Sequence, residues 1–302
     1  MSQPVPQVLA ASLTPLTADK SIDNDRYAGH VNALLKNGCD GVLLFGTTGE
    51  ANSFTVTERQ AALESLLEAG VAPSTLMVGT GCCALPDTLS LTRHALELGV
   101  HRVLVLPPFY YKNASEDGLF NTFAALIEQL DNPALRLYLY HFPKMAVVAF
   151  TPELIARLAE RFPGQLAGIK DSTGNREHTM MLNSRFPSLE VFAGSEMFLL
   201  EYLRAGGAGC ISATTNLTAS LAAVVRDHYH LPDAELDQQQ LSAVRSVFER
   251  YPMIGALKGL LAMQTGDSGW EHLRLPLSNL DKDSVAELRH ALSELNFPGQ
   301  AD

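Results

Sequence analysis

The chain has 302 residues, of which 46% are hydrophobic and 18% are charged. This composition is enough to bury a large core, and it suits one large domain or a barrel with an appendage. The formal net charge of −11 argues against nucleic acid and anionic membrane surfaces as partners, although a local cluster of donors can still bind an acidic small molecule.

We expect a cytoplasmic protein with reduced thiols. No apolar run reaches the roughly 18 residues that a transmembrane helix needs, and the N-terminal stretch lacks the basic and apolar regions of a secretory signal. The cysteines show neither a Cys-x-x-Cys nor a Cys/His ligand spacing, so we expect buried thiols rather than a metal site. They are Cys39, Cys82, Cys83 and Cys210.

Apolar runs closed by glycine, proline or polar turns alternate with stretches of helical periodicity through most of the chain. We expect strands over 8–13, 40–45, 75–79, 101–106, 135–140, 166–170, 189–193 and 208–212. The helices between them are expected over 23–36, 57–69, 85–98, 115–130, from 151 onward, and over 176–185, 196–204 and 217–228. Eight strand–helix units repeating every 25 to 35 residues or so predict a (β/α)8 TIM barrel. An open doubly wound sheet is the alternative, but it would not require eight evenly spaced units.

The last part of the chain has helical periodicity and no strand pattern, over 233–250, 253–263 and 281–295. We therefore predict a barrel over 1–230 that holds the active site, followed by a C-terminal helical domain over 231–302. No low-complexity linker separates the two parts, so the helical domain is expected to pack on the barrel.

Lys170 ends the sixth expected strand, and a polar turn follows it at once. Such barrels and sheets place their active sites at the C-terminal ends of the strands. Burial favours the neutral form of an amine, and an unprotonated amine can attack a ketone to form a Schiff base. Lys170 is therefore the candidate nucleophile. The alternative is a surface lysine whose apolar stem packs at the strand end.

Other polar or backbone groups follow neighbouring strands and should share the same face of the barrel. Thr47 and Thr48 offer hydroxyl and N–H groups in a glycine-flanked turn that can hold a carboxylate, or they form a plain glycine-rich turn. Tyr140 can exchange a proton with the carbinolamine that precedes a Schiff base, or it is a packed core tyrosine. Tyr110 could extend this relay. Gly194 directly follows the seventh expected strand, and Ile211 lies near the end of the eighth.

Three segments in this order resemble the signatures of the dihydrodipicolinate synthase/N-acetylneuraminate lyase family. They are Gly46-Thr-Thr-Gly-Glu50, Tyr140-His-Phe-Pro143 and Gly168-Ile-Lys-Asp-Ser-Thr-Gly174. The resemblance covers nearly the whole chain, including the helical tail. It implies a (β/α)8 barrel with a C-terminal helical domain, a homotetramer, and class I Schiff-base chemistry without a metal or other cofactor on pyruvate or a larger 2-oxo acid.

The resemblance also implies a role for each matching position. Lys170 corresponds to the Schiff-base lysine and Tyr140 to the acid/base residue. Thr47 and Thr48 correspond to the groups that bind the carboxylate of the 2-oxo acid, and Ile211 lines that pocket through its backbone. Tyr110 corresponds to a relay tyrosine that in many members enters the site of a neighbouring subunit.

Two departures from the family pattern bear on the substrate. In the dihydrodipicolinate synthase branch an arginine stands two positions after the Tyr-x-x-Pro proline, whereas this chain has Met145 there, preceded by Lys144. A methionine cannot replace a bidentate guanidinium. Met197 and Ala213 likewise supply none of the polar groups with which sialic acid lyases hold a polyhydroxyl chain. We therefore expect a shorter or less polar substrate.

The sequence leaves several functions open. The first is a lyase that cleaves a 2-keto-3-deoxy sugar acid or related 4-hydroxy-2-oxo acid and releases pyruvate. The same enamine could expel a hydroxyl or an amine, which would make the protein a dehydratase or deaminase. The others are dihydrodipicolinate synthase with an altered carboxylate anchor and a non-catalytic 2-oxo acid binder, because fold alone does not imply function.

Overall fold

The computed structural model describes residues 5–297. Residues 1–4, part of the stretch in which we see no secretory signal, lie outside the described residues. Eight parallel strands pair in chain order, and the last pairs with the first, so the sheet is a closed barrel. The strands are β1 (Gln7–Ala11), β2 (Gly41–Leu44), β3 (Leu76–Gly79), β4 (Arg102–Val105), β5 (Arg136–His141), β6 (Leu166–Asp171), β7 (Glu190–Ala193) and β8 (Gly209–Ser212). The predicted (β/α)8 barrel is confirmed.

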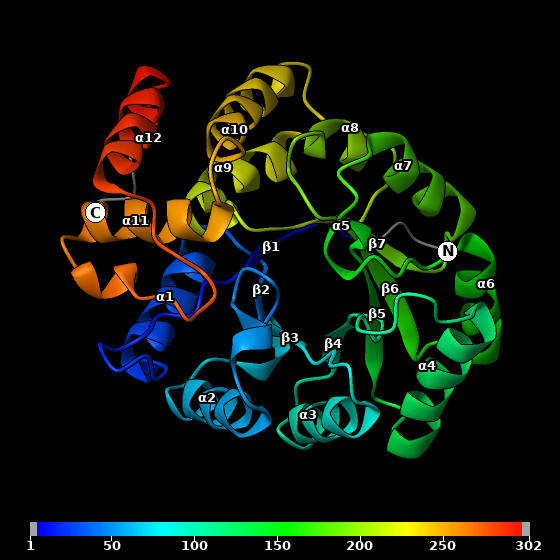
Figure 1. Cartoon of the computed structure of the whole chain (residues 1–302). Helices are drawn as coiled ribbons and strands as arrows, with labels where there is room; N and C mark the ends of the chain where they lie inside the picture. The colour runs from blue at the N-terminus through cyan, green and yellow to red at the C-terminus, as the bar shows by residue number, and fades with distance from the viewer. Residues whose placement is uncertain (1–4, 298–302) are drawn as a thin grey trace.

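The helices form an outer ring around the strands (Figure 1). Their bounds are α1 (Asn24–Lys36), α2 (Val56–Glu68), α3 (Leu85–Glu97), α4 (Glu116–Leu130), α5 (Pro143–Ala146), α6 (Pro152–Arg161), α7 (Arg176–Arg185), α8 (Leu199–Arg204) and α9 (Thr215–His228). Short 3-10 turns cover Ala51–Ser53, Pro73–Thr75 and Ser268–Glu271. The main core lies between this ring and the strands, and a smaller apolar cluster fills the barrel interior.

Several element boundaries differ from the expected ones because capping groups decide where a helix begins. Thr55 caps α2 and forms a capping box with Glu58, so this helix starts before the expected Thr57. The short helix α5 was not expected at all. It directly follows β5 and has proline at its first position.

The C-terminal region is helical, as expected, and packs against one side of the barrel (Figure 1). It contains α10 (Ala234–Phe248), α11 (Met253–Thr265) and α12 (Lys282–Glu294). Its apolar cluster includes Leu13 from the end of β1 and Leu217 from α9. The helical region is therefore continuous with the core of the barrel rather than tethered to it.

A buried ion pair also fastens this region to the barrel. The side chains of Glu50 and Lys258 are fully buried, and the Lys258 amine contacts a Glu50 carboxylate oxygen. The same amine donates to the His272 carbonyl at 2.8 Å, while the Arg274 N–H donates to the second Glu50 oxygen at 2.9 Å. Both charges are thus paired and hydrogen-bonded, which burial requires.

Two further expectations concern the thiols and the membrane. Cys39 and Cys210 are buried, but Cys83 is exposed, so the expectation that all the thiols are buried was wrong. Cys83 lies in the turn just before α3, where its side chain reaches solvent. Among the described residues, no helix is both long and apolar enough to cross a membrane.

Candidate active site

Lys170 and Tyr140 lie side by side at the C-terminal ends of β6 and β5. The two residues are register partners in the parallel ladder, so their side chains project on the same face. The Lys170 amine lies 3.5 Å from the Tyr140 hydroxyl and 4.5 Å from the centre of its ring. Both side chains are almost entirely buried, at 4% exposure. The lysine is therefore a cavity residue and not a surface residue with a packed stem.

The hydroxyl of Tyr140 also contacts the loop that follows β2. The Thr47 Oγ1 lies 3.3 Å from it, so Lys170, Tyr140 and Thr47 form a chain of polar groups. The ring of Tyr140 stacks on Phe142 with 5.6 Å between centres. This packing fixes the phenol while its oxygen stays open to the cavity.

The turn with Thr47 and Thr48 presents unused backbone donors. Within residues 5–297, the N–H groups of Thr47 and Thr48 donate to no protein acceptor, whereas the Thr47 carbonyl accepts from Glu50. Gly49 packs against the carbonyl of Ser12, where a Cβ would lie 2.9 Å from that oxygen. Two adjacent N–H groups and two hydroxyls in a fixed turn can hold a carboxylate.

One cavity of about 780 Å³ joins these residues to Gly194 and Ile211, two of the other predicted site residues. Thr47, Thr48, Tyr140, Lys170, Gly194 and Ile211 all line it. A Cβ on Gly194 would lie 2.8 Å from both the Asp171 carbonyl and the Ser172 Cα, so only glycine fits against the turn after β6. Phe142, Met145 and Met197 also line the cavity and make part of its wall apolar.

Tyr110 is the one predicted site residue that does not join this cavity. It is 73% exposed in the loop between β4 and α4, and its ring contacts Tyr111 edge-on at 5.3 Å. Among the described contacts its hydroxyl reaches neither Tyr140 nor Thr47. Within a single chain, the row of polar groups formed by Lys170, Tyr140 and Thr47 therefore does not extend to Tyr110.

The sequence did not indicate Arg245, which enters the cavity wall from α10. Its Nη1 donates to Ser212 at 2.9 Å and to Thr214 at 3.0 Å, and lies 3.3 Å from a carboxylate oxygen of the fully buried Glu196. Glu196 also accepts hydrogen bonds from Ser212, Thr214 and Thr218. No motif surrounds Arg245 in the sequence, so only the packing of α10 reveals it.

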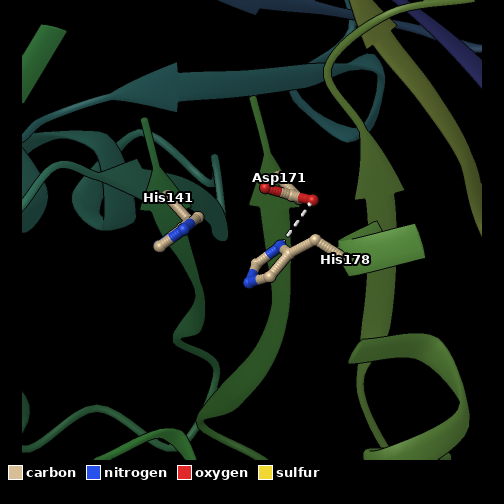
Figure 2. Close-up of side chains that lie close together, drawn as sticks. All are labelled: His141, Asp171 and His178. Atoms are coloured by element: carbon tan, nitrogen blue, oxygen red, sulfur yellow. Dashed lines mark hydrogen bonds and ion pairs between the residues drawn. The ribbon is translucent and has the colours of Figure 1, made fainter. Parts of the chain in front are cut away.

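Behind the cavity, His141, Asp171 and His178 form a second polar cluster (Figure 2). Side chains alternate along a strand, so His141 and Asp171 project away from the cavity that Tyr140 and Lys170 face. The rings of His141 and His178 stack with 5.0 Å between centres. His141 therefore packs behind the site and does not line the cavity.

Hydrogen bonds already occupy this cluster. Asp171 accepts from His178 Nδ1 at 3.0 Å, from the Thr179 hydroxyl at 2.7 Å and from the Thr173 hydroxyl at 3.0 Å. His141 Nδ1 accepts the Phe150 N–H at 3.2 Å, and burial lowers the pKa of His141 while Asp171 opposes this effect. The neutral ring and the saturated carboxylate brace the ends of β5 and β6, so the arrangement fits a hydrogen-bond network better than a metal site.

The closed barrel and the cavity at the C-terminal ends of its strands define the chain as a (β/α)8-barrel enzyme. The model of the dihydrodipicolinate synthetase family matches residues 4–295. The chain therefore belongs to this family and is a class I lyase.

Individual relatives agree with this assignment. The chain is 39% identical over 290 residues to an uncharacterized DapA-like lyase of Chloroflexus aurantiacus, covering 95% of this chain and 96% of the relative. The crystal structure of dihydrodipicolinate synthase from Agrobacterium tumefaciens is 33% identical with a TM-score of 0.88, over 96% of this chain and 99% of that one. A prophage protein of the same family from E. coli K12, solved in complex with pyruvate, is 25% identical with a TM-score of 0.87, over 97% and 99% of the two chains.

Proposed function

We propose that the protein binds a 4-hydroxy-2-oxo acid as an imine on Lys170 and cleaves it to release pyruvate. The observation that carries this proposal is the buried Lys170 amine, 3.5 Å from the Tyr140 hydroxyl in a cavity of about 780 Å³. The pyruvate complex of the E. coli relative gives the proposal further support.

Imine formation uses the groups that surround Lys170. The unprotonated amine adds to the C2 ketone, and the resulting carbinolamine loses water to give the imine. Tyr140 supplies and removes the protons that this dehydration needs, because its hydroxyl faces both Lys170 and Thr47. The hydroxyls and free N–H groups of Thr47 and Thr48 bind the C1 carboxylate. Gly194 and Ile211 complete the wall around it.

Cleavage then follows from the charge on the imine. The C4 hydroxyl gives its proton to Tyr140, the bond between C3 and C4 breaks, and the electron pair moves into the iminium to form an enamine. The aldehyde leaves, C3 takes up a proton, and water hydrolyses the imine to pyruvate and free Lys170. Loss of a hydroxyl or an amine from C4 would instead begin with removal of a C3 proton from the intact imine, and the resulting enamine, which still carries C4, would expel the leaving group.

A second candidate is dihydrodipicolinate synthase, because the relative from Agrobacterium tumefaciens carries that name. Met145, which is 61% exposed, stands at the position of the arginine that would hold the second substrate's carboxylate. A coupled assay with pyruvate and aspartate semialdehyde separates the two candidates. Consumption of both compounds would favour the synthase.

Borohydride trapping tests the shared part of both candidates. The protein is incubated with pyruvate, reduced, and digested, and the modified peptide is identified by mass spectrometry. The proposal expects an adduct on Lys170, followed by pyruvate release from at least one 4-hydroxy-2-oxo acid in a substrate panel. An adduct without any such release would overturn the cleavage reaction but keep the imine. Absence of any adduct would favour a 2-oxo acid binder.

The assembly and the domain division belong to the same proposal. We infer a barrel over 1–230 and a helical domain over 231–302 in a cytoplasmic homotetramer. The exposed pair Tyr110 and Tyr111, near the exposed Met145 and Val147, offers an apolar surface at which a second copy could dock. Tyr110 would then complete the relay of a neighbouring subunit. Light scattering and a Tyr110→Phe variant test this arrangement.

A further inference from the structure

Arg245 places a guanidinium in the wall of the cavity, away from Lys170. Its side chain is 11% exposed. The Nη1 group is fixed by Ser212, Thr214 and Glu196, and the Nε group donates to Glu249 at 2.9 Å. These contacts set the plane of the guanidinium before any ligand arrives.

The Nη2 group of Arg245 is the part left over. A guanidinium carries five N–H donors, and two of them are on Nη2. In the part of the chain that the structure describes, Nη2 donates no hydrogen bond to the protein. A guanidinium that is largely buried at a cavity and has two N–H donors unused is suited to bind a planar or tetrahedral anion.

Two other charged side chains besides Lys170 line the same cavity. Lys144 enters from α5, and its amine lies beside Gly174 in the turn after β6. Glu249 is the acid in the lining, and Arg245 already binds it.

The position of Arg245 over β8 sets the length of the ligand. Ser212, which it contacts, ends β8, and Lys170 lies on β6, two strands away. Neighbouring strands are about 4.8 Å apart, so the backbones of Lys170 and Ser212 are separated by roughly 10 Å. Pyruvate cannot span this distance from an imine on Lys170, whereas a chain of about five to seven carbons can.

We propose that Arg245 is a specificity-determining residue that binds an anionic group, a carboxylate or a phosphate, at the far end of the 2-oxo acid. This inference rests on the proposed imine at Lys170 and names the class of substrate that the site takes. It also revises the expectation of a less polar substrate, because α10 supplies a guanidinium whose Nη2 donors make no hydrogen bond to the described protein residues.

The test compares two compounds of equal length, 4-hydroxy-2-oxohexanedioate and 4-hydroxy-2-oxohexanoate. Each is trapped at several concentrations with cyanoborohydride, and the total adduct on Lys170 is measured by peptide mass spectrometry. We expect the dianion to half-saturate the wild type at a concentration roughly 10- to 100-fold lower, as a charged hydrogen bond provides. A third compound with a terminal phosphate distinguishes the two anionic groups.

Variants then assign the preference to Arg245. Arg245→Gln should reduce the ratio of the two half-saturation concentrations to about one, and Arg245→Lys should keep part of it. The ratio does not depend on how much protein is folded, so a less stable variant can still be read. Arg250→Gln, an exposed arginine just beyond α10, is the matched control and should keep the wild-type ratio.

Equal half-saturation of the wild type by the two compounds would overturn this inference, and so would a preference that persists in Arg245→Gln. Both results would leave the imine itself established. The absence of any adduct with either compound or with pyruvate would instead refute the proposed function.

Discussion

The two ends of the cavity differ in how far their polar groups are bonded to the protein. At the end formed by β2, β5 and β6, the contacts of Tyr140 with Lys170 and Thr47 are long, at 3.5 and 3.3 Å. At the end formed by β8 and α10, the carboxylate of Glu196 accepts from three hydroxyls and pairs with Arg245. Tyr140 and its neighbours therefore remain available to react with a bound molecule. Glu196 and Arg245 are held by the protein, so they are suited to binding a molecule rather than to reacting with it.

The largest effect should come from the amine itself. Lys170→Ala removes the nucleophile, so we expect no borohydride adduct and a loss of turnover on the order of 10⁴-fold or more. Lys36→Ala, an exposed lysine at the end of α1, is the control and should behave like the wild type. Retained turnover in Lys170→Ala would mean that the reaction does not proceed through an imine on Lys170.

Tyr140→Phe should separate chemistry from stability. Loss of the proton carrier should lower kcat by about 10²- to 10⁴-fold. The long contacts of its hydroxyl predict a change in the free energy of unfolding below about 1 kcal/mol. Steady-state kinetics and urea unfolding on the same preparation check both values. A large loss of stability would contradict the idea that this end is loosely bonded.

Glu196→Ala should give the opposite result for stability. Its carboxylate is fully buried and supports three hydroxyls and Arg245, so we expect a loss of about 3–5 kcal/mol in the free energy of unfolding. Glu153→Ala is the control, because its pair with Arg185 is exposed to solvent and its loss should change the free energy of unfolding little. Similar losses in the two variants would remove the distinction between the ends.

The smallest predicted effect depends on pH and concerns His30, which lies on α1. His30 is buried and contacts Asn216, whose amide also binds Leu13 and Ala11. Burial lowers the pKa of His30 from 6.5 to about 4. The unfolded chain therefore binds a proton that the folded chain excludes, and stability falls as the pH drops below about 6.5, by about 3 kcal/mol once the pH is below 4.

Urea unfolding across this pH range measures the loss, and His30→Gln should flatten it. His228→Gln is a suitable control because His228 is much more exposed and pairs with Asp237. An unchanged slope in His30→Gln would assign the acid sensitivity to other groups.

The sequence predicted that the residues at one end of the cavity lie together, because they stand at strand ends. Once the barrel is inferred, Thr47, Tyr140 and Lys170 must meet at one rim, and the structure places them on one cavity. Local patterns carry this information, since each residue directly follows or ends an apolar run.

The fixed end could not be predicted in this way. Arg245 lies in the middle of an amphipathic helix, and its place in the cavity depends on how α10 packs over β8. No local pattern encodes that packing. The position of Tyr110 was not predictable from the motif either, because its side chain is exposed in the loop between β4 and α4 and does not line the cavity. The small helix α5 escaped notice because four residues show no periodicity.

The pair of Glu50 and Lys258 has a consequence for biosynthesis. The two residues are separated by 208 positions, so Glu50 leaves the ribosome long before its partner. Until Lys258 arrives, the carboxylate beside the Thr47–Thr48 turn cannot be buried without a counter-ion, which is strongly unfavourable. A nascent chain that ends before α11 can form strands, but the Thr47–Thr48 turn beside Glu50 cannot yet adopt its final conformation. The part of the cavity formed by the Thr47–Thr48 turn is therefore completed late, when most of the chain has been synthesised.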